Sequence, residues 1–278
     1  SLPEGWQGKT LVPWPNRIVG ARYAYRGQEY PVPCNEPETG SALHGLVGWA
    51  DFQVVATSAG DDAVGDAPSS VALELTLPGS YAYPWSLQVD VRFALDARAG
   101  LTVAATTTCL GAGAPAAPDA VGAPESDGLL APAPYGVSFH PYLTRSVPLD
   151  ECVLQVPAAR VLDVDERMAP AAERDVAGTD WDWRAGRPVG TISTDNAYTG
   201  LPQGPWEVRL TGGEAGSTVV LSAEAPWVQV YTAEHLGRRG VAVEPMTCPP
   251  DAFNSGRDLV ELEVGRSHSF SYSLREDD

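Results

Sequence analysis

The stretch LQVDVRFALD, residues 87–96, alternates apolar and polar side chains with a period of two. Leu87, Val89 and Val91 fall on one face of an extended chain, and polar residues fall between them on the other. This alternation is typical of a strand in an antiparallel sheet that has one face against the core and one face in water.

The segments on both sides of this stretch are of the same kind. VALELTLP at 71–78 repeats the alternation, and LTVAATTTCL at 101–110 reads as a further strand. Short apolar runs separated by turn residues continue through the chain, which contains 25 Pro and 28 Gly. No segment of twelve or more residues has a convincing helical period, and the sequence shows no internal repeat, Gly-rich phosphate loop or GxSxG motif. The chain is therefore predicted to be all-β.

The length of 278 residues is compatible with one domain, because all-β domains of about 200–250 residues occur as single units. We assign residues 1–278 to a single domain. The Ala/Pro/Gly-rich segment 111–134 is predicted to be a low-complexity surface loop within it, because the strand pattern resumes in the same style after it.

The net charge of −18 argues against nucleic acid and against anionic membrane surfaces as partners. The sequence has no signal peptide and no apolar run long enough to span a membrane. Its four cysteines show no CxxC and no short metal-binding spacing, so we expect free thiols and no zinc site. These features predict a cytoplasmic protein. They do not indicate its oligomeric state.

Glu244 is the first candidate functional residue, in VAVEPMTCPPDAFNSG at 241–256. In a strand Val241 and Val243 would share one face and Glu244 would lie on the other. Pro245 cannot donate to a sheet ladder, so the strand is expected to end there. A carboxylate at a strand end can line a cleft, and the alternative is a solvated strand-end side chain.

Four further candidates lie in turns or between strands. Arg17 follows Asn16 in PWPNRI, and its planar guanidinium could bind hydroxyls, or it could staple a surface loop. His44 in LHG and His140 in HPYL are each either site residues or packed structural histidines, and an imidazole suits proton transfer near neutral pH. Asp195 is a candidate acceptor or a turn-capping residue.

Taken together, the motifs resemble those of the aldose 1-epimerase (galactose mutarotase) family. They occur in one order along the chain: PWPNRI at 13–18, LHG at 43–45, HPYL at 140–143, the TDNAYTG turn at 194–200 and EPMTCPPDAFNSG at 244–256. The resemblance covers nearly the whole chain. It implies a large, mostly antiparallel β-sandwich with a sugar cleft on one concave sheet. It also implies that the leading strands usual in the family are absent here.

By this resemblance Glu244 is the base and His140 the acid that open and reclose the ring of a free aldohexose such as glucose or galactose. The partner is then a small sugar, and the reaction needs no metal or redox cofactor. Arg17, His44 and Asn16 would bind sugar hydroxyls, and Asp195 would accept hydrogen bonds from them. Tyr142 or Trp49 would offer an aromatic face. We expect Glu244 and His140 to face each other across a space the size of one sugar ring.

The sequence departs from the family pattern in places, for example at Gly48, where relatives often carry Arg. Three alternatives stay open. The first is a non-catalytic carbohydrate-binding sandwich, which would not need Glu244 and His140 together. The second is a structural or interaction domain, which predicts no convergence of the candidate residues. The third is a hexose-6-phosphate 1-epimerase, which needs an additional cationic phosphate site that the sequence does not locate.

Overall fold

The computed structural model describes residues 4–59, 69–112, 131–213 and 216–277. This part of the chain is built mainly from strands, and its one α-helix is the four-residue α1, Ala252–Ser255. Three 3-10 turns accompany it: η1 (Val19–Ala21), η3 (Leu149–Glu151) and η5 (Glu234–Leu236). The strands are β1 (Thr10–Leu11), β2 (Arg17–Ile18), β3 (Arg22–Tyr25), β4 (Gln28–Pro31), β5 (Ala42–Leu43), β6 (Gln53–Ser58), β7 (Ser69–Leu77), β8 (Trp85–Asp96), β9 (Gly100–Ala112), β10 (Ala133–Tyr135), β11 (Ser138–Phe139), β12 (Tyr142–Leu143), β13 (Val153–Gln155), β14 (Arg160–Val164), β15 (Pro170–Asp175), β16 (Arg187–Pro188), β17 (Asp195–Thr199), β18 (Trp206–Thr211), β19 (Thr218–Ala223), β20 (Trp227–Tyr231), β21 (Val241–Met246), β22 (Val260–Leu262) and β23 (Ser267–Asp277).

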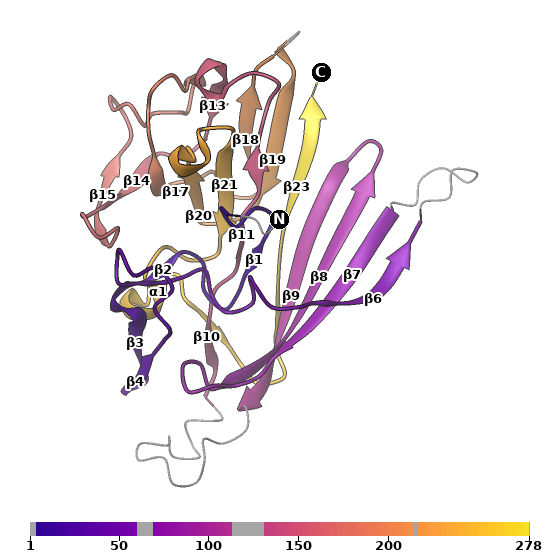
Figure 1. Ribbon diagram of the computed structural model, residues 1–278, viewed down its shortest axis with the longest axis vertical. Coiled ribbons are helices and arrows are strands. Elements are labelled where there is room, and N and C mark those ends of the chain that lie inside the picture. The colour runs from indigo at the N-terminus through magenta and orange to yellow at the C-terminus, as the bar shows by residue number, and fades with distance from the viewer. Residues whose placement is uncertain (1–3, 60–68, 113–130, 214–215, 278) are drawn as a thin grey trace.

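Two large antiparallel sheets organise the molecule. One has nine strands in the order β16-β13-β18-β19-β23-β9-β8-β7-β6. The other has eight, in the order β1-β11-β21-β20-β17-β14-β15, with β12 also paired to β21. Figure 1 shows the long strands β7, β8 and β9 extending away from the shorter strands of the eight-stranded sheet. The predicted all-β, mostly antiparallel sandwich is confirmed.

The period-two stretch forms most of β8, which pairs with β7 on one side and β9 on the other. Leu87, Val89 and Val91 are buried as the alternation predicts. The pattern fails at the end of the strand, where Leu95 is 59% exposed. Leu95 pairs with Ser69 and Leu101 at the ends of the neighbouring strands, so it stands at the rim of the sheet.

The main core joins the two sheets. Phe139 of β11 stacks on Phe270 of β23 with ring centroids 5.8 Å apart, and it also contacts Tyr272. Val241 and Val243 of β21 belong to the same buried cluster. Burial of large side chains of this kind contributes about 1.5–3 kcal/mol each. These contacts therefore fix β11, and with it the paired strand β21, against the nine-stranded sheet.

Strand β21 continues through Pro245 to Met246, so the expected stop at Pro245 is wrong. The amides of Val243 and Thr247 donate to the carbonyls of Pro141 and Val137, in the segment that contains β11 and β12. The nitrogen of Pro245 faces the same side, because alternate residues of a strand point their N–H groups the same way. It falls opposite the end of β11, where the missing donor is tolerated.

Other expectations have mixed outcomes. The four cysteines are free, as predicted. Of the predicted loop 111–134, residues 113–130 lie outside the described residues, and the ends of the segment belong to β9 and β10. Among the described residues, no helix is long and apolar enough to cross a membrane.

Candidate active site

A cavity of about 430 Å³ opens between the eight-stranded sheet and the loops that contain β2 and β5. Its volume lies within the range of about 300–1,000 Å³ typical of small-molecule sites. Seven of the eight candidate residues from the sequence, all but Trp49, line it: Asn16, Arg17, His44, His140, Tyr142, Asp195 and Glu244. The structure thus brings together residues from five separate segments, while their chemical roles remain predictions.

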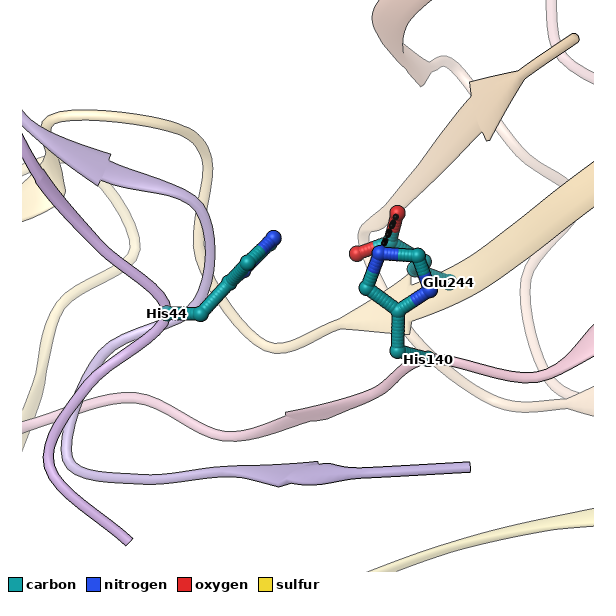
Figure 2. A group of neighbouring side chains, drawn as sticks. All are labelled: His44, His140 and Glu244. Carbon is teal, nitrogen blue, oxygen red and sulfur yellow. Dashed lines mark ion pairs between the residues drawn. The ribbon is translucent and has the colours of Figure 1, made fainter. Parts of the chain in front are cut away.

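His140 and Glu244 meet because of the way β21 is paired. His140 lies between β11 and β12, and both of these strands pair with β21, which carries Glu244. His140 Nε2 lies 3.3 Å from Glu244 Oε1, and both side chains are almost fully buried. Figure 2 shows the two in direct contact, with His44 pointing toward them from the other side of the space.

This geometry corrects one expectation from the sequence. His140 and Glu244 are in contact and do not face each other across a space the size of a sugar ring. The physical reason is the strand pairing: β11 and β12, which flank His140, both pair with β21, which carries Glu244.

Burial sets the protonation of the pair. It raises the pKa of Glu244 well above its usual value, and the nearby Asp195 carboxylate adds to this increase while Arg17 opposes it. Burial also lowers the pKa of His140 to about 3, with a smaller contribution from His235. A neutral imidazole beside a carboxylic acid avoids burying charge. When the pair holds one proton, burial favours its residence on Glu244.

His44 reaches the cavity from a strained turn. It follows β5 with a left-handed φ of 64°, and Gly45 follows with a φ of 70°. A Cβ at position 45 would lie 2.3 Å from the carbonyl oxygen of Val12, so only glycine fits there. Burial, then His140 and Arg17, lower the pKa of His44 well below its usual value. His44 is therefore neutral at pH 7.

Arg17 is held by Glu36, a cavity residue that the sequence analysis missed. Arg17 Nε donates to Glu36 Oε2 at 2.7 Å and Nη2 donates to Oε1 at 2.8 Å, a bidentate pair in a largely buried setting. Thr39 Oγ1 also donates to Glu36. Burial alone would raise the pKa of Glu36, but Arg17 and Thr39 outweigh it and lower the pKa. Glu36 fixes the direction of the guanidinium. Arg17 Nη1 donates one of its two N–H groups to Asn16 Oδ1 at 3.4 Å and can offer the second to another acceptor.

Asp195 begins strand β17 and is not the turn residue that the sequence indicated. Gln229 Nε2 donates to Asp195 Oδ1 at 2.7 Å, and Gln229 lies opposite Glu244 in the β20–β21 register. Burial raises the pKa of Asp195, while Arg17 and Gln229 act against this increase. Gln229 thus ties the Asp195 carboxylate to the strand beside Glu244, and nothing in its local sequence marked it.

Aromatic side chains form the cavity wall beside His140. The ring of Tyr142 stacks on His140 with centroids 5.1 Å apart. Tyr231 and His235 line the cavity together, with the Tyr231 hydroxyl 2.6 Å from His235 Nδ1. Trp6 also lines it, whereas Trp49 does not. Tyr142 therefore lines the cavity, and of these two tryptophans it is Trp6 that does so.

His44, His140 and Glu244 could also hold a metal ion, because each offers one donor atom and these atoms lie within 4.8 Å of one another. Two histidines and a glutamate form a donor set that zinc accepts. The 3.3 Å between His140 Nε2 and Glu244 Oε1 already suits two ligands about 2.0–2.2 Å from one zinc ion. That the reaction needs no metal stays a prediction.

The fold and the site together define a class: an all-β antiparallel sandwich with a polar cavity that contains a buried histidine–glutamate pair. The family profile described as aldose 1-epimerase matches residues 2–116 and 124–275 of the chain. The protein belongs to the aldose 1-epimerase family, whose members bind sugars.

The chain is also similar to a relative in sequence and to solved structures in fold. The chain is 37% identical over 274 residues to the uncharacterized protein YihR of Escherichia coli K12, covering 98% of this chain and 80% of the relative. Its fold matches galactose 1-epimerase from Lactobacillus acidophilus with a TM-score of 0.79 and 17% identity, over 100% of this chain and 81% of that chain. The GalM/aldose epimerase homologue from C. elegans also matches with a TM-score of 0.79 and 19% identity, over 99% of this chain and 83% of that chain. These two structures establish the galactose mutarotase-like fold.

Proposed function

We propose that the protein is an aldose 1-epimerase that interconverts the α and β anomers of a free, uncharged aldohexose such as glucose or galactose. The observation that carries the proposal is the contact of 3.3 Å between His140 Nε2 and Glu244 Oε1 in a cavity that can hold one sugar. A purely structural domain gives no reason for such a pair to be buried beside Arg17 and Asp195.

In the proposed mechanism Glu244 removes the proton of the C1 hydroxyl while His140 protonates the ring oxygen. The C1–O5 bond breaks, the aldehyde forms and rotates about the C1–C2 bond, and the reverse proton transfers close the ring. This step requires the proton of the pair to reside on His140. The short contact lets it pass from Glu244 Oε1 to Nε2, and a sugar hydroxyl that donates to the unpartnered Glu244 Oε2 would favour the carboxylate.

The remaining polar residues have the chemistry to bind and orient the sugar. Arg17 Nη1 and His44 can bind hydroxyl groups, and Asp195 can accept hydrogen bonds from them. Each positioned acid or base contributes about 10²–10⁴-fold to the rate of such a reaction.

An uncharged substrate is favoured by the charges around the cavity. Four acidic residues line it besides the protonated Glu244, namely Glu4, Glu36, Glu38 and Asp195. Arg17 is the only Lys or Arg among the described residues that line it, and Glu36 already pairs with it. A phosphate group would meet repulsion without a cation of its own. The hexose-6-phosphate alternative is therefore disfavoured. Separately, we propose a cytoplasmic location.

Polarimetry tests the proposal directly. Freshly dissolved α-D-glucose or α-D-galactose should reach its equilibrium rotation faster with protein than without, while glucose 6-phosphate should show little acceleration. Binding of these hexoses by the folded protein with no acceleration for any sugar in a broad panel would point to the carbohydrate-binding alternative. Acceleration of the phosphorylated sugar alone would establish the third alternative.

A further inference from the structure

Trp6 occupies an unusual position at the cavity wall. Its backbone is left-handed, with a φ of 61°, which is uncommon for a bulky side chain. Strain of this kind persists where surrounding contacts impose it, often at ligand sites. The contacts around Trp6 explain how it is imposed.

The indole of Trp6 lies directly over Gly48. A Cβ at position 48 would lie 2.6 Å from Trp6 Cζ3 and 3.1 Å from Cε3. Real Cβ atoms do not approach other atoms to within 3.0 Å, so any side chain at position 48 would displace the indole. The absence of a side chain at Gly48 is what gives Trp6 its place.

The indole is packed on two further sides. Its ring meets His44 edge-on with centroids 5.0 Å apart, and it meets Trp49 at 5.1 Å in a tilted arrangement. Lys9 Nζ in turn lies 4.6 Å from the centroid of the Trp49 ring. Trp6 is therefore held between a site histidine and a partly exposed second tryptophan, while it also lines the cavity.

The backbone around Trp6 is tied to the acid–base pair. Gly8 N donates to the carbonyl of His140 at 2.9 Å, and His140 N donates to the carbonyl of Lys9 at 3.0 Å. The Tyr142 hydroxyl donates to the carbonyl of Gly5 at 2.9 Å. Trp6 is thus fixed relative to His140 through both neighbouring stretches of backbone.

We propose that Trp6 is a substrate-binding residue whose indole covers the apolar C–H face of the hexopyranose, and that Gly48 is the residue that admits it. This rests on the proposed function and deepens it. A planar apolar ring complements the C–H face of a sugar while the carboxylates and Arg17 take its hydroxyls. It selects a pyranose with an uninterrupted C–H face as the substrate.

A double-mutant cycle on sugar affinity tests the proposal. D-galactose and D-glucose at anomeric equilibrium are titrated against the full chain by NMR, with the wild type, Trp6→Ala, Gly48→Ala and the double variant. Binding at equilibrium is measured independently of catalysis. We expect Trp6→Ala and Gly48→Ala each to weaken binding about tenfold, an effect typical of losing one aromatic contact. In the Trp6→Ala background the clash at position 48 is gone, so Gly48→Ala should add nothing.

A second measurement separates stacking from mere support of His44. Stacking predicts a raised KM with kcat changed less than about threefold, and saturation transfer from the indole to the ring C–H protons of the sugar that disappears in Trp6→Ala. Trp6→Phe should recover most of the affinity. Trp181→Ala, which removes a partly buried tryptophan from a different cavity, serves as the matched control and should leave the affinity unchanged.

Three results would overturn the inference. They are unchanged affinity in a folded Trp6→Ala protein, a loss in kcat alone, and a further loss on adding Gly48→Ala to Trp6→Ala. A wild type that binds hexoses through Trp6 but does not accelerate mutarotation would support this inference while refuting the proposed catalysis.

Discussion

His140 Nε2 and Glu244 Oε1 lie 3.3 Å apart, at the point where β21 passes from pairing with β12 to pairing with β11. The sheet itself therefore sets this distance, because the two residues belong to hydrogen-bonded neighbours. A pair positioned by backbone pairing is already in place before a sugar arrives, which reduces the cost of orienting it.

Removing either member of this pair should abolish most of the activity. We expect Glu244→Gln to lower kcat by about 10²–10⁴-fold, and His140→Asn to lower it strongly, because each change removes a proton-transfer group. Polarimetry with the uncatalysed rate subtracted measures both. Thermal unfolding provides the control, since a variant that loses activity and folding together says nothing about catalysis. A folded Glu244→Gln protein with wild-type kcat would refute the assignment.

The plot of kcat/KM against pH should have its acid limb at lower pH, and its basic limb at higher pH, than the ordinary pKa values of histidine and glutamate would give. The active pair holds one proton, and the burial that lowers the pKa of His140 to about 3 delays the second proton until acidic pH. The burial that raises the pKa of Glu244 delays loss of the last proton as pH rises. Activity should therefore persist below pH 6.5 and fall only in more acidic solution. An acid limb with its midpoint at 6.5 or above would contradict this, and the apparent values belong to the pair.

Glu36→Gln should raise KM more than it changes kcat, because it removes the carboxylate that orients Arg17 through two hydrogen bonds. Leaving a buried guanidinium without its partner should also cost about 3 kcal/mol of stability. Steady-state kinetics and urea unfolding measure the two effects. Glu29→Gln, at an exposed position on β4, controls for the loss of one negative charge. Equal behaviour of the two variants would exclude the positioning role.

Gly45→Ala should destabilise the protein by at least about 3 kcal/mol, since its Cβ would lie 2.3 Å from a backbone oxygen at a φ of 70°. Gly20→Ala is the matched control, because Gly20 has the same φ of 70° and open space around it. We expect it to cost only about 1–2 kcal/mol, the backbone penalty alone. Denaturant midpoints compare them. Similar losses would show that close approach at Gly45 does not hold the His44 turn.

Removal of metal should leave the activity intact. Dialysis against EDTA and assay in metal-free buffer should give the same kcat as untreated protein, because one carboxyl and one imidazole suffice for the proposed proton transfers. Metal analysis of the dialysed sample confirms removal. Loss of activity that zinc restores would instead indicate that His44, His140 and Glu244 act as ligands.

The parts of the molecule that depend on local pattern could be predicted from the sequence. Period-two alternation located β7 and β8, and five short motifs located residues that the fold brings into one cavity. The sequence did not predict Glu36, because its role depends on Arg17, a residue distant in the chain. It did not predict Trp6, because the place of this side chain depends on the missing side chain at Gly48. The prediction that the strand ends at Pro245 was wrong because the sheet leaves the nitrogen of Pro245 without an acceptor to pair with, and the local sequence does not show this.

The residues around the cavity are drawn from positions as far apart as Trp6 and Glu244, so no short fragment of the chain contains the site. Contacts of such long sequence separation form late and slowly during folding. Catalysis therefore offers a measure of complete assembly. In a refolding experiment, mutarotation should return with the slowest phase, after spectroscopic signals of sheet formation have already recovered.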